Sequence, residues 1–294
     1  MLPFSIVGKL EKALALKTGL ETTITSSQAT GGGSINQTVK ITYGDANFFV
    51  KWNRSDLYPG MFDYEKAGLQ LIGKESSIRV PEIIESGSEA SISYLLMEYI
   101  PATSPTHSFW ESFGIQLAEM HQKSAALFGL NDSNYIGSLP QKNTLSESWD
   151  DFYLHQRLLP LISTAQQKKL LSSAILHSFD RLTDRIKTIF PIEKPSLLHG
   201  DLWSGNFLCS GDKQPVLIDP AVYYGHREMD IAMTQLFGGF HPIFYEAYNH
   251  RFPLEKGWQE RADVCNLYPV LVHVILFGDS YVFQLENMLR RILR

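Results

Sequence analysis

The sequence predicts an α+β fold of two lobes, in which a small antiparallel-sheet lobe precedes a larger, mainly helical lobe. Two observations lead to this prediction. Between residues 22 and 53, threonine, valine, isoleucine and phenylalanine alternate with polar residues, as in strands exposed on one face. Farther along the chain, apolar residues recur at helical spacing instead. A proline-containing segment separates these two regions, so we place the lobes at residues 1–100 and 101–294.

The N-terminal lobe is predicted to begin with a helix over residues 5–17, because Ile6 and Leu10 recur at helical spacing. Gly19 can end this helix. Strands should follow, with a glycine-rich segment between the first two and a tight turn at Gly44 between the next two. The predicted strands are residues 21–28, 35–44, 47–53, 82–85 and 91–100, and a second helix is predicted over residues 60–73.

The C-terminal lobe is predicted to consist of helices with two short strands between them. Prolines and small polar residues over 101–105 are typical of a linker into this lobe. The predicted helices are residues 109–124, 150–159, 166–190 and much of 230–294, and the short strands are residues 207–208 and 216–218.

The overall composition excludes several classes of protein. The net charge is −5, with no basic stripe, so no nucleic-acid partner is expected. The longest apolar tract, residues 264–285, is interrupted by His273 and Asp279 and is expected to be a buried helix rather than a membrane span. Lys9 and Glu11 follow a very short apolar run, so no signal peptide is expected. Two cysteines form no disulfide framework and favour a reducing cytoplasm.

The strongest functional signal is the segment HGDLWSGN over residues 199–206, which is followed by Ile218-Asp219-Pro220. Phosphoryl transfer needs a carboxylate that accepts the proton of the attacking hydroxyl and oxygen ligands that hold magnesium on the phosphates. Kinases supply these groups from an aspartate, an asparagine five positions later and an aspartate after a short strand. The pattern therefore predicts a protein-kinase-like fold that uses ATP and Mg²⁺, with Asp201 as catalytic base and Asn206 and Asp219 as magnesium ligands. For the short HGD triplet alone, a structural turn is an equally good interpretation.

A lysine and a glutamate in the N-terminal lobe are predicted to act on the nucleotide. Lys51 ends the third strand, where a kinase places the lysine that binds the α- and β-phosphates. Glu65 lies in the following helix, at the position of the acid that orients this lysine. Asp63 and Glu82 are weaker candidates for the same ion pair. A lone lysine at a strand end is usually only solvated, but the order of these residues along the chain favours phosphate binding.

The glycine-rich segment between the first two strands is predicted to cover the phosphates, through Gly31, Gly32, Gly33 and Ser34. Glycines allow backbone amides to approach phosphate oxygens closely. By itself, a glycine run is more often a flexible hairpin tip, and no Gly-Lys-Ser/Thr follows to make a Walker loop.

The segment where the two predicted lobes join is expected to bind adenine. Met97, Glu98 and Ile100 lie there, and their backbone groups can hydrogen-bond the base while Met97 lines its pocket. The alternative is an ordinary buried strand. Asp230 is expected to support the predicted catalytic loop, residues 199–206, by accepting hydrogen bonds from the amides of that loop. His121, on an apolar helix, is expected to be a core or loop-supporting residue rather than a catalytic one.

The sequence resembles the fructosamine kinase (ketosamine 3-kinase) family, within the aminoglycoside and choline kinase-like branch of the protein-kinase-like superfamily. The resemblance implies ATP-dependent phosphorylation of the sugar 3-hydroxyl on ketosamines such as fructosamines and ribulosamines. The substrate would be a small-molecule ketosamine or a glycated amine. This phosphorylation promotes deglycation. The segments that carry it are residues 134–141, 148–153, 199–206, 219–230 and 236–240.

Two other functions stay open from the sequence. An aminoglycoside or other small-molecule phosphotransferase would share the catalytic residues, but a polycationic substrate favours an acidic rim, and acids after Asp230 are scattered. A nucleotide-binding pseudokinase would lack one of Lys51, Asp201, Asn206 or Asp219, all of which are present. Many members of the family carry a cysteine near the glycine loop that supports redox-sensitive dimers, whereas residues 25–37 contain none. The oligomeric state is left undetermined.

Overall fold

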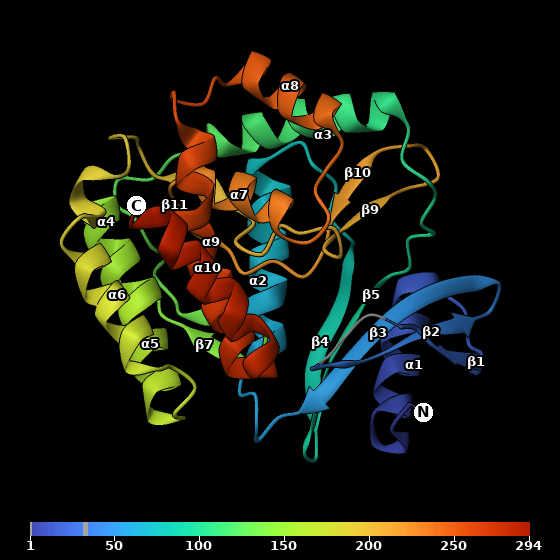
Figure 1. Cartoon of the computed structure of the whole chain (residues 1–294). Coiled ribbons are helices and arrows are strands. Elements are labelled where there is room, and N and C mark those ends of the chain that lie inside the picture. The colour runs from blue at the N-terminus through green and yellow to red at the C-terminus, as the bar shows by residue number, and fades with distance from the viewer. Residues whose placement is uncertain (1, 32–34) are drawn as a thin grey trace.

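The computed structural model describes residues 2–31 and 35–294 and contains the two predicted lobes (Figure 1). The smaller lobe holds a five-stranded antiparallel sheet in the order β1-β2-β3-β5-β4. Its helices α1 (Phe4–Thr18) and α2 (Met61–Glu75) confirm the two predicted helices. The strands, which confirm the five predicted ones within a few residues, are β1 (Ile24–Ala29), β2 (Gln37–Tyr43), β3 (Ala46–Arg54), β4 (Ile83–Glu89) and β5 (Ile92–Glu98).

The two helices of the small lobe pack on opposite faces of its sheet. Side chains alternate along a strand, so Val50 of β3 packs with α1 while its neighbour Phe49 packs on the other face. On the α1 side, Ile6 and Leu10 are completely buried. On the other side, Phe62 of α2 joins Leu95 and Met97 of β5. The sheet therefore fixes α2, which carries Glu65, beneath the strand that carries Lys51.

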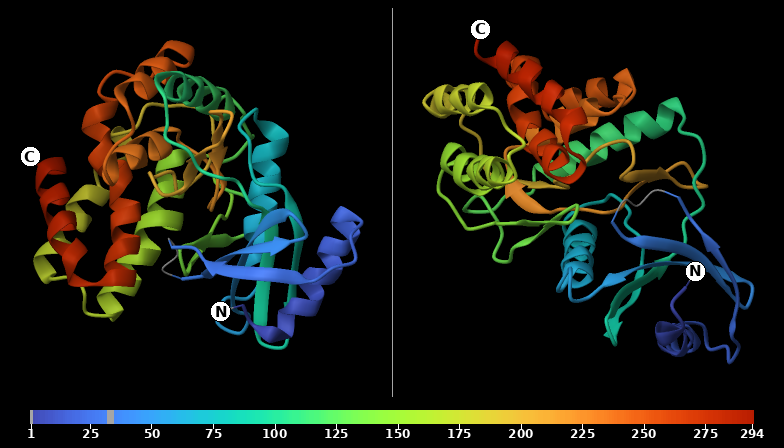
Figure 2. Two further views of the ribbon diagram at one scale, coloured as in Figure 1. Left: turned by 90° about the vertical axis from the view of Figure 1, so that its right-hand side faces the viewer. Right: turned by 60° about the horizontal axis from the view of Figure 1, so that its bottom comes forward.

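The larger lobe is mainly helical and lies above and to the left of the small-lobe sheet in Figure 1; Figure 2 shows the same two lobes from two other sides. Its helices are α3 (His107–His121), α4 (Trp149–Phe152), the π-helix η1 (Tyr153–Leu158), α5 (Leu159–Gln167), α6 (Ser173–Thr183), the 3₁₀ turn η2 (Ile186–Thr188), α7 (Glu228–Leu236), α8 (Pro242–Arg251), α9 (Trp258–Phe277), the 3₁₀ turn η3 (Asp279–Tyr281) and α10 (Val282–Ile292).

Three pairs of very short antiparallel strands lie among these helices. The pair β9 (Phe207–Cys209) and β10 (Pro215–Leu217) confirms the two predicted strands. The pairs β6 (Asn134–Ile136) with β7 (Leu139–Gln141), and β8 (Ser196–Leu198) with β11 (Tyr223–Gly225), were not predicted. Each has three residues per strand, which is too short for a recognisable alternation.

The prediction of one helix over residues 166–190 is wrong. Helix α5 ends at Gln167, and Lys169 adopts a left-handed φ of 58°, which stops the helix. A new helix begins after Ser172, whose side chain accepts a hydrogen bond from the Ile175 amide as an N-cap. Gly278 likewise ends α9 at a φ of 80°, within the apolar tract that was predicted as one buried helix.

Within residues 2–31 and 35–294, no helix combines the length and the apolar character that crossing a bilayer needs.

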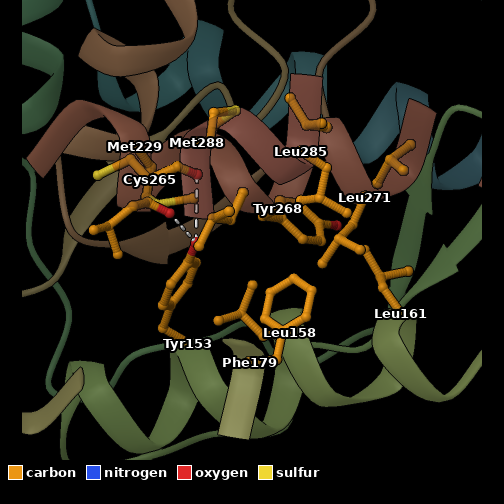
Figure 3. Close-up of a cluster of buried hydrophobic side chains, with 14 of the residues drawn as sticks. Tyr153, Leu158, Leu161, Phe179, Met229, Cys265, Tyr268, Leu271, Leu285 and Met288 are labelled. Carbon is orange, nitrogen blue, oxygen red and sulfur yellow. Dashed lines mark hydrogen bonds between the residues drawn. The ribbon is translucent and has the colours of Figure 1, made fainter. Parts of the chain in front are cut away.

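Cys209 and Cys265 are unpaired and buried, with 2% and 0% exposure. Figure 3 shows Cys265 inside the large apolar cluster of α5, α6, α9 and α10.

We expect activity and oligomeric state to be indifferent to mild oxidation and to reductant. Burial raises the pKa of the Cys265 thiol well above its ordinary value, so little reactive thiolate forms. A disulfide between two copies needs Cα atoms within about 7 Å, which buried thiols do not reach. Gel filtration with parallel kinase assays, with and without reductant, checks this. A reductant-sensitive dimer that disappears in Cys209→Ser or Cys265→Ser would contradict it.

Candidate active site

A single cleft of about 910 Å³ brings together the residues that the sequence motifs predict. The small lobe contributes Lys51 and Glu65, and the large lobe contributes Asp201, Asn206 and Asp219. The cleft has the size of a cofactor or substrate site. The geometry of these five residues therefore decides what chemistry the cleft can perform.

The catalytic loop begins directly after β8 and is fixed by a buried carboxylate. The Asp230 side chain accepts hydrogen bonds from the backbone amides of His199 at 2.7 Å and Gly200 at 2.9 Å. His121 lies 3.2 Å from the same carboxylate and 2.7 Å from the Tyr248 hydroxyl. These contacts confirm the predicted supporting roles of Asp230 and His121.

Gly200 has a structural reason to be glycine. Its φ is 83°, and a Cβ atom there would lie 2.1 Å from the Ala221 carbonyl oxygen. The catalytic loop and the segment after Asp219 can therefore approach closely, and the Ala221 amide donates to the His199 carbonyl at 2.9 Å. The ring Nε2 of His199 also lies 2.9 Å from the Ile218 carbonyl. The two segments of the motif form one unit.

Asp201 and Asn206 are held together within the loop. The Asn206 Nδ2 donates to both the carbonyl and the carboxylate of Asp201, at 2.8 Å each. Burial raises the pKa of Asp201 to about 7, against the opposing effect of the Asn206 hydrogen bond. A carboxylate with a pKa near neutrality is a better proton acceptor than an ordinary aspartate while still ionising at physiological pH.

Lys51 lies between two carboxylates. Its Nζ is 2.7 Å from Glu65 and also forms an ion pair with Asp219. Burial alone would lower the pKa of Lys51, but the charges of Asp219 and Glu65 outweigh it and raise the pKa above its ordinary value. Lys51 therefore stays cationic. Glu65, rather than Asp63 or Glu82, is its glutamate partner.

Asp219 occupies an unusual backbone conformation for an aspartate. Its φ is 55°, in the left-handed region that side chains disfavour. Helix α2 packs closely on the following residues, since a Cβ at Gly68 would lie 3.2 Å from Val222 and 3.3 Å from Pro220. Strained backbone that the surroundings hold in place is common at functional sites.

The donor set fits a magnesium ion bound through phosphate. Both contacts of the Asn206 amide nitrogen go to Asp201, which leaves its amide oxygen as an acceptor, and about half of the Asp219 side chain is exposed to the cleft. Within the described residues, no group of three or more histidines, cysteines, aspartates or glutamates could hold a metal alone. Magnesium usually takes one or two protein oxygens and completes its shell with phosphate and water.

The residues predicted to bind the nucleotide line the other side of the cleft. Met97, Glu98 and Ile100 all border it, and so does Gly31. The Glu98 side chain accepts hydrogen bonds from Arg79 and from the Glu82 amide, and the Glu98 amide donates to the Glu82 carbonyl at 2.9 Å. Of the polar groups of Glu98, this leaves the backbone carbonyl for a base. The other predicted loop residues, Gly32, Gly33 and Ser34, lie outside the described residues.

A group of aromatic side chains around His273, called here the aromatic end of the cleft, lines part of the cleft together with Trp203. The sequence did not predict this group. His273 of α9 lies with its ring centroid 4.8 Å from those of Phe237 and Tyr281 and 5.4 Å from that of Phe277. The Trp203 ring lies 5.9 Å from Phe237. Burial lowers the pKa of His273, so this group is uncharged at neutral pH. The four-residue spacing of His273 and Phe277, which places both on one face of α9, was the available signal.

The fold and this cleft define a kinase of the protein-kinase-like class. A thermostable mutant of the aminoglycoside phosphotransferase APH(4)-Ia, solved in complex with AMP-PNP and hygromycin B, shares the fold with a TM-score of 0.62 at 13% identity, covering 96% of this chain and 98% of that one. The sequence profile of the fructosamine kinase family matches residues 7–294, and the chain belongs to that family. It is therefore an enzyme of the phosphotransferase class.

Individual relatives agree with this assignment over most of their length. A probable ketoamine kinase of Enterococcus faecium is 40% identical over 260 residues, 88% of this chain and 92% of the relative. The chloroplastic protein-ribulosamine 3-kinase of Arabidopsis thaliana is 38% identical over 90% of this chain and 82% of its own. The crystal structure of a fructosamine-3-kinase candidate from Thermobifida fusca has a TM-score of 0.87 at 34% identity, covering 98% and 99% of the two chains.

Proposed function

We propose that the chain transfers the γ-phosphate of ATP to a sugar hydroxyl of fructosamine- or ribulosamine-type ketosamines. The observation that carries this proposal is the meeting of the Asp201–Asn206 pair with the Asp219–Lys51–Glu65 ion-pair group in one cleft. One group can remove a proton from an acceptor hydroxyl, and the other can neutralise and orient phosphates. Both operations are what phosphoryl transfer requires.

Each residue has a proposed part in the reaction. Asp201 accepts the proton of the attacking hydroxyl, which its raised pKa favours. Lys51, oriented by Glu65, contacts the α- and β-phosphates, and Asn206 and Asp219 are the protein ligands of Mg²⁺. The bound ion neutralises charge on the phosphates. Residues 1–100 then act as the nucleotide-binding lobe and residues 101–294 as the lobe that carries the catalytic loop and the acceptor.

The residues at the junction of the lobes and the glycine-rich segment are proposed to position the nucleotide. The backbone carbonyl of Glu98 and the side chains of Met97 and Ile100 suit an adenine base at the junction of the lobes. Gly31, with Gly32, Gly33 and Ser34, is proposed to cover the phosphates. The proposed location of the protein is the cytoplasm, because Cys209 and Cys265 are both free thiols.

The aromatic end of the cleft favours a ketosamine over an aminoglycoside as acceptor. Among the described residues that line the cleft, the acids are Glu65, Glu98, Asp201 and Asp219, and none belongs to the aromatic end. A polycationic antibiotic needs several carboxylates there. A ketosamine carries one amine, and aromatic faces suit a single ammonium group or an apolar substituent. The family of the chain and its relatives support the same choice.

An acceptor panel tests this proposal. ATP consumption should be measured with a fructosyl-amine, a ribulosyl-amine and an aminoglycoside side by side, and we expect turnover with one or both ketosamines and none above background with the aminoglycoside. Fructose without an amine is the matched control for the sugar alone. Preferential phosphorylation of the aminoglycoside, or ATP binding without transfer to any acceptor, would contradict the proposal.

A further inference from the structure

Two buried amide side chains donate hydrogen bonds to the main chain that follows Asp219, and they come from a different segment than the catalytic loop. The Asn134 Nδ2 donates to the Val222 carbonyl at 2.8 Å, and the Gln141 Nε2 donates to the Ala221 carbonyl at 3.0 Å. Both amides come from the hairpin of β6 and β7, whose sequence is distinctive but which the proposed chemistry does not use. The hairpin thus contacts the backbone immediately after the proposed metal ligand.

These two amides are oriented by a relay of one-way hydrogen bonds. Arg157 can only donate, and its guanidinium donates to the Asn143 amide oxygen at 2.7 Å. The Asn143 nitrogen must therefore face away, and it donates to the Asn134 oxygen at 3.0 Å. Gln141 donates to the same oxygen at 2.7 Å, which leaves the Asn134 nitrogen for Val222. The relay fixes which end of each amide meets the Asp219 segment.

A tyrosine closes the relay from α9. The Tyr268 hydroxyl donates to the Gln141 amide oxygen at 2.6 Å. The Gln141 nitrogen is then directed to Ala221, because its oxygen is already occupied. Tyr268 is 3% exposed and Gln141 2%. Because both side chains are buried, deleting one of them removes a hydrogen bond from a buried polar group.

The relay begins at Arg157, a buried cation whose hydrogen-bond partners are all uncharged. Arg157 is completely buried in the π-helix η1, with its guanidinium 4.0 Å from the centre of the Tyr223 ring and 4.6 Å from that of Phe152. Its hydrogen bonds go to the carbonyls of Lys142 and Gln156 and to Asn143, and it has no carboxylate partner among the described residues. Single π-turns inside helices occur often at functional sites.

From these contacts we infer that Asn134 and Gln141 are positioning residues for the Asp219 carboxylate. Asp219 holds a left-handed φ of 55°, which its own side chain disfavours, so neighbouring contacts must maintain it. The catalytic loop bonds one side of this segment through the Ala221 amide, and the relay bonds the carbonyls on the other side. The inference rests on the proposed role of Asp219 as a magnesium ligand.

The test measures the magnesium-dependent part of nucleotide affinity rather than turnover. The Kd of ADP is determined by titration calorimetry in Mg²⁺ and in EDTA for each protein. The magnesium ratio, which is the Kd in EDTA divided by the Kd in Mg²⁺, is then compared between proteins. In Gln141→Met, which keeps the side-chain length but removes the donor to Ala221, we expect this ratio to shrink about tenfold, as when a supporting contact of a metal ligand is lost. The Kd in EDTA should not change.

Two tyrosines of the same core provide a matched pair of variants (Figure 3). Tyr268→Phe removes the hydroxyl that orients Gln141, whereas Tyr153→Phe removes a hydroxyl that donates to the Val264 carbonyl at 2.5 Å, away from the relay. Both should lower the melting temperature to a similar extent. Only Tyr268→Phe should reduce the magnesium ratio, by a few fold, and it provides the test if Gln141→Met fails to fold.

The outcomes separate this inference from the proposed function. If Asp219→Ala abolishes the magnesium dependence while Gln141→Met and Tyr268→Phe retain the wild-type ratio, the positioning role is overturned and the proposed function stands. An equal decrease in Tyr153→Phe would also overturn it, since general loosening would then explain the effect. If Asp219→Ala keeps the wild-type ratio, the metal role of Asp219 fails, and the positioning role fails with it.

Discussion

Replacing Asp201 by asparagine is expected to reduce kcat by about 10²–10⁴-fold, the usual contribution of a general base. The asparagine oxygen can still accept the hydrogen bond from the Asn206 side chain, so the loop keeps its geometry. It cannot take up a proton from the acceptor hydroxyl. Lys51, Glu65 and Asp219 are untouched, so the Kd of the nucleotide should change little. Steady-state kinetics with a ketosamine and calorimetric titration of ADP measure the two quantities.

The same substitution should not destabilise the fold. The pKa of Asp201 is raised in the folded protein, from 3.8 to about 7, so its ionisation opposes folding increasingly as the pH rises between these values. The neutral asparagine removes this penalty. We therefore expect a difference between the melting temperatures of Asp201→Asn and wild type, measured in metal-free buffer. This difference should increase in favour of the variant from pH 4 to about pH 7 and then level off. A folded Asp201→Asn protein with near-normal turnover would remove Asp201 from the role of base.

Replacing Asp219 by alanine is expected to abolish productive binding of the magnesium–nucleotide complex. Asp219 contributes the only carboxylate of the proposed metal site, and a missing ligand cannot be supplied by Asn206 alone. Its loss also leaves Lys51 paired with Glu65 only, so the lysine is held less firmly. Titration of ADP in the presence of Mg²⁺ should show affinity no higher than in EDTA.

Asp212 is the matched control for this variant, because it is the other acid between the catalytic loop and Asp219. It lies in the turn between β9 and β10, is exposed, and accepts a hydrogen bond from the Ser210 hydroxyl at 2.5 Å. Asp212→Ala should leave nucleotide affinity and turnover within about twofold of wild type, as surface substitutions usually do. The reverse ranking of the two alanine variants would show that the metal ligand is elsewhere.

The sequence could predict the parts of the site that are local in the chain. The spacing of Asp201, Asn206 and Asp219 survives folding because a loop and one short hairpin connect them. Lys51 and Glu65 follow from the order of strand and helix in the small lobe. The structure brings all five together in the cleft as the sequence predicted.

Contacts between distant segments could not be predicted in this way. Residues 134–141 carry part of the family resemblance, but the hydrogen bonds of Asn134 and Gln141 reach Val222 and Ala221, which lie 88 and 80 residues later. The break after Gln167 depends on a left-handed Lys169, a conformation that no local pattern signals. The aromatic end of the cleft combines Phe237 with His273 and Tyr281, which only the packing of α7 against α9 brings together.

The most direct test of the account is to identify the atom that receives phosphate. Purified protein should be incubated with ATP, Mg²⁺ and a fructosyl-amine or ribulosyl-amine, and the products examined by phosphorus and carbon NMR. We predict one phosphate ester on the sugar 3-hydroxyl of the ketosamine, with ADP formed in equal amount and no ester in Asp201→Asn. ADP formation without any sugar phosphate, or an ester that persists in Asp201→Asn at the wild-type rate, would contradict the account.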